Sequence, residues 1–199
     1  MPIALVTPGL EHLPGYADAL RRGWSPTTQR GEAARREQLA AIEADAAAFV
    51  ASRTDPEARG EPIALPDGSR VPRLPGFIRW IWDGAFCGTI GLRWQPGTAA
   101  LPPHVLGHIG YAVVPWKRRR GHAREALRLL LPEAAALGLS HVEITTDPGN
   151  IASRRVIEAC GGRLVERFHK PPTHGGTETL RYRIDLDRGA ETFSPRLSS

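Results

Sequence analysis

The spacing of apolar residues in the N-terminal part of the chain favours helices over strands. A short apolar run predicts a strand over residues 3–6, and helical spacing predicts a helix over 8–22. The clearest amphipathic helix is predicted over 31–53, where apolar residues form one stripe. Residues 56–75 are rich in proline, which predicts a loop with a hairpin turn at Asp67-Gly68.

From residue 76 onward the pattern changes to short strands alternating with helices. In the first strand Ile78, Trp80 and Trp82 lie on one face, and Asp83-Gly84 is a hairpin signal. Strands are predicted over 76–82, 86–94, 107–114, 141–146, 163–168 and 177–186, and helices over 121–137 and 150–160. This order predicts an α/β fold with a mixed sheet and helices packed on it.

Length and composition narrow the class of protein. At roughly 150 residues per domain, the 199 residues predict a single domain over 1–187 and a polar tail over 188–199. No apolar run is long enough to cross a bilayer, and the first residues lack a charged lead, so we expect a cytoplasmic protein with no membrane partner. Cys87 and Cys160 are too few for a disulfide framework or a cysteine-rich zinc site; we expect both to be buried, and no metal ligand set is predicted.

The net charge of +5 suits nucleic acid, a membrane surface or a phosphate-bearing ligand. Its densest cluster, residues 117–120, follows a predicted strand and opens a predicted helix. Unpaired N–H groups and the positive end of the dipole make a helix start suitable for phosphate, and Gly121 and Ala123 let a pyrophosphate approach the backbone. Charge alone would indicate a solvated surface run, whereas charge, glycine and position together favour a phosphate site. The chain has neither a P-loop nor a Gly-x-Gly-x-x-Gly motif.

Three segments in this order resemble the motifs of the GNAT superfamily of acyl-CoA-dependent N-acyltransferases. Residues 118–123, Arg-Arg-Arg-Gly-His-Ala, resemble the Arg/Gln-x-x-Gly-x-Gly/Ala signature, and residues 108–115 are similar to the strand before it. Residues 150–153, Asn-Ile-Ala-Ser, with Gly161-Gly162 downstream, are similar to the second motif. The resemblance covers about 76–186. It implies a central, mostly antiparallel sheet splayed between its fourth and fifth strands, an acyl-CoA-binding core over 76–187, and a variable substrate-side region over 1–75.

The resemblance also implies which residues hold the cofactor, acetyl-CoA. The main chain at Val113 would bind the pantetheine amides, and Asn150 and Ser153 would face the pantetheine or the acyl sulfur. Asn150 also suits the N-cap of the following helix, and the two roles are compatible. The pyrophosphate would lie against the loop residues Arg118, Arg119, Arg120, Gly121, His122, Ala123 and Arg124.

The implied reaction is direct attack of an amine on the thioester carbonyl. Because an alkyl ammonium has a pKa of roughly 10, a group or a water chain must take the proton. His108, where many relatives place Glu, is the first candidate base, and Glu143 on the next strand is the second. The usual acid is missing, because Ile157 stands where many relatives have Tyr. Tyr182 and Tyr111 are candidates to replace it, and the alternative is that no strong acid is needed, because a thiol is a fair leaving group.

The acceptor is left open by the sequence. A small-molecule or peptide amine is expected, and Arg73, Arg79 and Arg93 are candidates to bind an acidic one. The absent Tyr at Ile157 motivates an alternative, a CoA-binding regulatory or interaction module of the same fold. The hypothesis of a nucleic-acid partner rests only on the net charge. It is not favoured, because the basic loop is already predicted to bind the pyrophosphate of the cofactor. A homodimer is compatible with the sequence, which has no feature that requires one.

Overall fold

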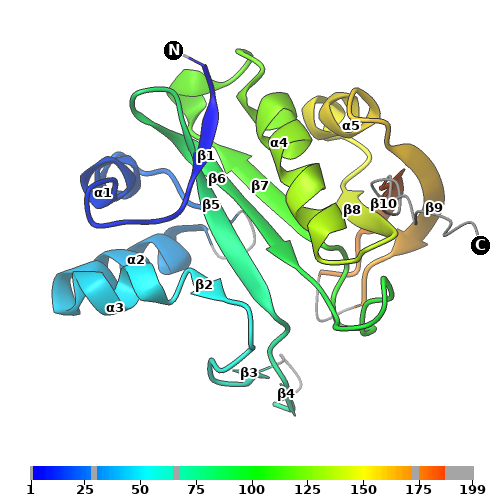
Figure 1. Ribbon diagram of the computed structural model, residues 1–199, viewed down its shortest axis with the longest axis horizontal. Helices are drawn as coiled ribbons and strands as arrows, with labels where there is room; N and C mark the ends of the chain where they lie inside the picture. The colour runs from blue at the N-terminus through cyan, green and yellow to red at the C-terminus, as the bar shows by residue number, and fades with distance from the viewer. Residues whose placement is uncertain (1, 28–30, 65–67, 172–174, 187–199) are drawn as a thin grey trace, which may run out of the picture.

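The computed structural model describes residues 2–27, 31–64, 68–171 and 175–186. One antiparallel sheet holds the order β1-β5-β6-β7, with β2 paired to β5 (Figure 1). Its strands are β1 (Ala4–Val6), β2 (Thr54–Asp55), β5 (Gly76–Trp82), β6 (Phe86–Arg93) and β7 (Ile109–Val113). The register places Ile78, Gly91 and Gly110 side by side across β5, β6 and β7.

A second antiparallel sheet continues on the far side of β7. It has the order β8-β10-β9, from β8 (His141–Thr146), β9 (Arg163–His169) and β10 (Glu178–Asp185). β7 is an edge strand of the first sheet and β8 is an edge strand of the second. The predicted fold class, an α/β fold with a mostly antiparallel sheet splayed between its fourth and fifth strands, is therefore confirmed.

Helices cover opposite faces of the first sheet. Figure 1 shows α1 (Leu13–Arg21), α2 (Gly31–Ala44) and α3 (Ala46–Ala51) on one side, and α4 (His122–Ala136) and α5 (Ile151–Glu158) on the other. Trp80, Tyr16 and Phe86 join the first group to the sheet, with the Tyr16 and Trp80 rings stacked at 4.9 Å. Leu127 and Leu130 of α4 pack against Ile90 and Leu92 of β6 in the second core. Alternate residues of β5 and β6 thus serve different cores, as period-two alternation requires.

The structure corrects several predicted boundaries in the N-terminal part. The helix expected over 31–53 is two helices, because Asp45 is extended (φ −157°) and its side chain accepts the Ala48 N–H at 2.9 Å, which starts α3. The helix expected over 8–22 begins at Leu13, with Pro14 in its first turn. Residues 54–55 form an unpredicted strand. β3 (Ile63–Ala64) pairs with β4 (Arg70–Val71), as the expected hairpin requires.

Some expectations concern residues that lie outside the described ranges. Asp67 of the predicted hairpin turn and the expected polar tail, 188–199, are among them. Of the cysteines, Cys87 is buried as expected, whereas Cys160 is partly exposed. Every helix in the described part of the chain is too short or too polar to cross a membrane.

Candidate active site

β7 and β8 are neighbours that no ladder of hydrogen bonds joins in the described structure, and we call the place where they separate the β7–β8 opening. At their beginnings they are joined, because the His108 N–H donates to the Glu143 carbonyl at 2.7 Å and the Glu143 N–H donates to His108 Nδ1 at 2.9 Å. Beyond that point the two strands belong to different sheets. The Tyr111 and Ser153 hydroxyls share a hydrogen bond of 2.8 Å from β7 to α5. The edge of β7 therefore offers unpaired backbone groups beside this opening.

The loop between β7 and α4 has a backbone conformation that is suited to binding an anion. Arg119 (φ 59°) and Gly121 (φ 80°) both adopt left-handed backbone conformations. Successive N–H groups in such a loop make a concave anion site, and the start of α4 adds its dipole. The N–H groups of residues 119–124 have no acceptor among the described residues. These are the donors that the sequence predicted for a pyrophosphate.

A carboxylate that the sequence analysis missed holds this loop. Lys117 Nζ lies 2.8 Å from both Asp83 oxygens, and His122 Nε2 lies 3.0 Å from Oδ2. The two partners flank residues 118–121, so Asp83, in the β5–β6 turn, fixes both ends of the loop. Burial alone would raise the pKa of Asp83, but the hydrogen bonds from Lys117 and His122 lower it well below its usual value. Asp83 is therefore ionised at neutral pH.

Asp83, Cys87 and His122 also bring three potential metal ligands within 4.8 Å of one another. Metal binding needs a thiolate and a free carboxylate. Burial and Asp83 raise the pKa of the Cys87 thiol to about 12, and Lys117 occupies both carboxylate oxygens. The cluster is therefore an ion-pair anchor for the loop.

The other predicted cofactor contacts lie around the same opening. The Val113 carbonyl accepts a hydrogen bond from Arg118 Nε at 3.2 Å. Because Arg118 is exposed, a ligand amide can replace it by a change of side-chain rotamer. Asn150 Oδ1 accepts the Ser153 N–H at 3.1 Å, which confirms the N-cap reading and leaves the Asn150 amide group exposed.

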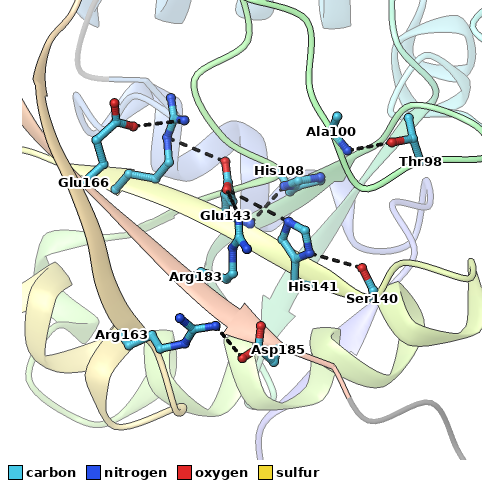
Figure 2. A network of polar contacts seen from close by, with 11 residues as sticks. Thr98, Ala100, His108, Ser140, His141, Glu143, Arg163, Glu166, Arg183 and Asp185 are labelled. Atoms are coloured by element: carbon cyan, nitrogen blue, oxygen red, sulfur yellow. Dashed lines mark hydrogen bonds and ion pairs between the residues drawn. The ribbon is translucent and has the colours of Figure 1, made fainter.

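The two predicted bases lie together where β7 and β8 meet (Figure 2). The His108 side chain is fully buried, and its Nδ1 lone pair is already occupied by the Glu143 N–H. Burial lowers the pKa of His108 to about 4, so the ring is neutral. The Glu143 carboxylate lies 2.9 Å from Arg183, 3.6 Å from Arg181 and 4.0 Å from His141. Both side chains thus have structural partners, and their role as base stays a prediction.

The neutral state of His108 makes stability pH-dependent. In the unfolded chain its pKa is near 6.5, against about 4 in the folded protein. Between these values only the unfolded state takes up the proton, so stability is lost as pH falls. At about 1.4 kcal/mol per pH unit, we expect the contribution of His108 to the free energy of unfolding to fall by about 3 kcal/mol from pH 7 to pH 4.

Denaturant titration at several pH values tests this expectation. His108→Asn keeps an acceptor for the Glu143 N–H and removes the titration, so its loss of stability between pH 7 and pH 4 should be smaller by about 3 kcal/mol. His169→Gln, on exposed β9, is the control and should follow the wild type. Parallel pH profiles for wild type and His108→Asn would contradict this account of His108.

The tyrosines considered as acids differ in where their hydroxyls point. The Tyr182 hydroxyl is directed at α5, where it donates to Glu158 at 2.9 Å and accepts from Arg154 at 3.3 Å. The Tyr111 hydroxyl instead lies beside Ser153 at the β7–β8 opening, and burial raises its pKa to about 12. Tyr111 therefore carries a proton at neutral pH, next to the residues predicted for the acyl sulfur.

The arginines predicted to bind an acidic acceptor lie on opposite faces of the sheet. Arg79 pairs with Glu133 of α4 at 2.8 Å, so its charge is already balanced on the α4 face. Arg73 and Arg93 line a cleft on the other face. The three arginines were predicted to bind one acidic acceptor, but the sheet separates Arg79 from the other two. The reason is that alternate residues of β5 and β6 face opposite ways.

Comparisons with known proteins agree with this geometry. A sequence profile of the acetyltransferase (GNAT) domain matches residues 36–163. A search of curated proteins finds no match. The solved microcin C7 self-immunity acetyltransferase MccE, in complex with acetyl-CoA and AMP, is 14% identical with a TM-score of 0.62, and 92% of each chain is covered.

Two ribosomal-protein acetyltransferases have a similar fold. RimL, the ribosomal L7/L12 α-N-protein acetyltransferase in complex with coenzyme A, has a TM-score of 0.61 at 13% identity, covering 94% of this chain and 95% of RimL. The Salmonella typhimurium enzyme that modifies the N-terminal serine of L7/L12 has a TM-score of 0.59 at 14% identity, with 93% and 95% covered. The TM-scores show a shared fold. The profile match spans more than half of the 199 residues. The chain therefore belongs to the GNAT acetyltransferase family.

Proposed function

We propose that the protein transfers an acetyl group from acetyl-CoA to a primary amine. The observation that carries the proposal is the row of N–H groups over residues 119–124, without acceptors in the described structure, beside the unpaired edge of β7. The row suits a pyrophosphate, and an extended pantetheine can bond the β7 edge as an added strand would. Solved structures with this fold contain acetyl-CoA or coenzyme A.

In this arrangement Val113 and Ser153 flank the pantetheine, and the acetyl group lies near the middle of β7. The amine nitrogen attacks the thioester carbonyl carbon, and a backbone N–H of β7 stabilises the oxyanion. The C–S bond then breaks, the coenzyme A thiolate takes a proton, and the nitrogen loses one. The base remains one of His108, Glu143 or a water chain. A water chain ending at Glu143 is favoured, because the Nδ1 lone pair of His108 is occupied.

Release of coenzyme A in the presence of acetyl-CoA and a panel of amines tests the proposal. Turnover with at least one amine, and formation of its N-acetyl product by mass spectrometry, is the expected result. Acetyl-CoA binding without turnover across the panel would instead favour the second candidate, a CoA-binding regulatory module. The observation that favours the second candidate is Ile157, which is fully buried and stands where many relatives carry a tyrosine as the acid.

We propose Tyr111 as the group that protonates the leaving thiolate. Its hydroxyl lies 2.8 Å from Ser153 at the opening. A positioned acid contributes about 100-fold or more; because a thiol is a fair leaving group, we expect Tyr111→Phe to lower kcat about tenfold with an unchanged KM for acetyl-CoA. Tyr182→Phe is the matched control and should leave kcat within about twofold. Equal kcat values for Tyr111→Phe and wild type would contradict this role.

A further inference from the structure

A small cleft lies on the face of β5 and β6 that is turned away from α4. Its volume is about 240 Å³. Ile78 and Gly91 form part of the floor, Arg53 and Arg73 come from the segments around β2 and β4, and Val105 closes another side. This volume is below the roughly 300 Å³ at which pockets hold drug-sized ligands, so the cleft suits a small molecule.

The charge of this cleft is unbalanced. Among the described residues that line it, Arg53, Arg73 and Arg93 are accompanied by one carboxylate, that of Asp55. Asp55 already accepts the backbone N–H groups of Arg59 at 2.8 Å and Gly60 at 2.9 Å. The positive charge of the cleft therefore exceeds what its own carboxylate can neutralise.

Among the described residues the guanidinium groups of Arg53 and Arg73 hydrogen-bond only to neutral groups, and Asp55 is the one carboxylate whose charge Arg73 influences. Arg53 donates to the Ser52 hydroxyl at 2.8 Å and covers the Phe49 ring, and Arg73 donates to the Glu61 carbonyl at 3.2 Å. Burial lowers the pKa of Arg53, and the nearby positive charge of Arg73 lowers it further. An anion bound between them would relieve this repulsion.

Arg93 brings the charge next to the reaction centre. In the described part of the chain its guanidinium has no hydrogen bond and no ion pair. Its Nη2 lies 3.8 Å from where a Cβ on Gly110 would be, and Gly110 pairs with Gly91 across β6 and β7. Gly110 belongs to β7, the strand whose edge borders the proposed pantetheine site. A group held by Arg93 is therefore within a small molecule's length of the thioester.

The neighbouring cavity provides a contrast. It has a volume of about 370 Å³ and is lined by Arg181 and Arg183 together with Glu143. Glu143 pairs with both arginines, and Arg181 also pairs with Glu166 at 3.1 Å (Figure 2). Because these charges are balanced within the protein, they provide no comparable site for an anion.

We propose that the cleft of Arg53, Arg73 and Arg93 binds the anionic group of the acceptor, which is a small primary amine bearing a carboxylate or a phosphate. The inference rests on the proposed acetyltransferase function and names its substrate class. Guanidinium groups suit both anions, because their N–H groups match two oxygens at once. Binding the anion at Arg93 leaves the amine at the other end of the molecule free to reach β7.

Matched amines that differ in the anionic group test the substrate class. 4-Aminobutyrate is compared with butylamine for the carboxylate, and O-phosphoethanolamine with ethanolamine for the phosphate. We expect kcat/KM to be at least tenfold higher for the anionic member of one pair, and the pair that shows it identifies the anion. Equal or better use of both neutral amines would overturn the inference, as would a preference for an acidic tetrapeptide over all four small amines.

Arg93→Gln assigns the preference to the cleft. We expect it to raise the KM for the preferred anionic amine at least tenfold, while the Kd for acetyl-CoA and kcat/KM for the neutral amine change less than twofold. Arg36→Gln, at a side chain 72% exposed on α2, is the matched control and should behave as the wild type. An unchanged anion preference in Arg93→Gln would overturn the assignment.

Measuring the binding of simple anions, which needs no catalytic turnover, distinguishes a failure of this inference from a failure of the proposed function. At least one of the anions succinate and phenylphosphate should stabilise the wild type against heat more than Arg93→Gln, whether or not acetyl-CoA is present. If acetyl-CoA does not bind but this difference holds, the proposed function fails and the anion cleft stands. If acetyl-CoA binds and neither anion distinguishes wild type from Arg93→Gln, the cleft is refuted and the proposed function stands.

Discussion

Asp83→Ala should weaken acetyl-CoA binding at least tenfold and lower the free energy of unfolding by about 3 kcal/mol. The stability loss arises because Lys117, only 19% exposed, would keep its charge without the carboxylate that now contacts it at 2.8 Å. The affinity loss arises because Lys117 and His122 would no longer hold residues 118–121 between them. Preorganised N–H donors bind an anion without first being ordered, and this advantage would be lost.

Calorimetric titration with acetyl-CoA and denaturant unfolding measure the two effects separately. Asp185→Ala is the matched control, because Asp185 also forms a 2.8 Å ion pair but is 63% exposed. An exposed pair contributes about 0–1 kcal/mol, so this control should keep both stability and affinity near the wild-type values. If Asp83→Ala bound acetyl-CoA as tightly as the control does, Asp83 would not be positioning the loop.

Gly88→Ala should lower stability by about 4 kcal/mol and abolish detectable acetyl-CoA binding. A Cβ at this position of β6 would lie 2.2 Å from the Ala112 carbonyl oxygen of β7, and the backbone has φ +152°, where other residues are strained. Overpacking and backbone strain cost about 1–3 kcal/mol each. Gly88 pairs with Val113, so relief of the clash would displace the strand end that precedes the pyrophosphate loop.

The matched control for this change is Gly138→Ala. Gly138 also has a positive φ, +81°, but a Cβ there would meet nothing within 4 Å. Its substitution should cost about 1 kcal/mol and leave acetyl-CoA affinity unchanged. Similar affinity in Gly88→Ala and Gly138→Ala would show that the end of β7 does not need its present position for cofactor binding.

Local features of the sequence predicted the parts of the structure that depend on short-range chemistry. The strand over 141–146 begins and ends as predicted, because polar and apolar residues alternate along it and every second side chain is buried. The exposed N–H groups of 119–124 were predicted because they follow from a glycine at a helix start. Asp45 also carried a signal, since Asp is a favoured N-cap, but the apolar stripe continued across it and the break was missed.

The remaining parts of the site depend on contacts between residues distant in sequence. In the sequence, Asp83 has only the pattern of an ordinary hairpin turn residue. Its contact with Lys117, 34 positions away, forms only when the chain folds. Histidine is a residue type suited to act as a base. In the structure, however, burial keeps the His108 ring neutral, and the Glu143 N–H occupies its Nδ1. Arg53 and Arg93 come from different elements and meet only because β2 pairs with β5. Charges and pKa values in the site therefore required the three-dimensional arrangement.

Thermal unfolding with acetyl-CoA, dephospho-CoA, acetyl-pantetheine and adenosine tests the central claim most directly. A ligand that binds only the folded state at 100 times its Kd stabilises it by about 2.7 kcal/mol. We predict saturable stabilisation by acetyl-CoA, most of it retained by dephospho-CoA, and little with acetyl-pantetheine or adenosine, which lack the pyrophosphate. Absence of any shift with acetyl-CoA, or an equal shift with acetyl-pantetheine, would contradict a pyrophosphate site at residues 119–124.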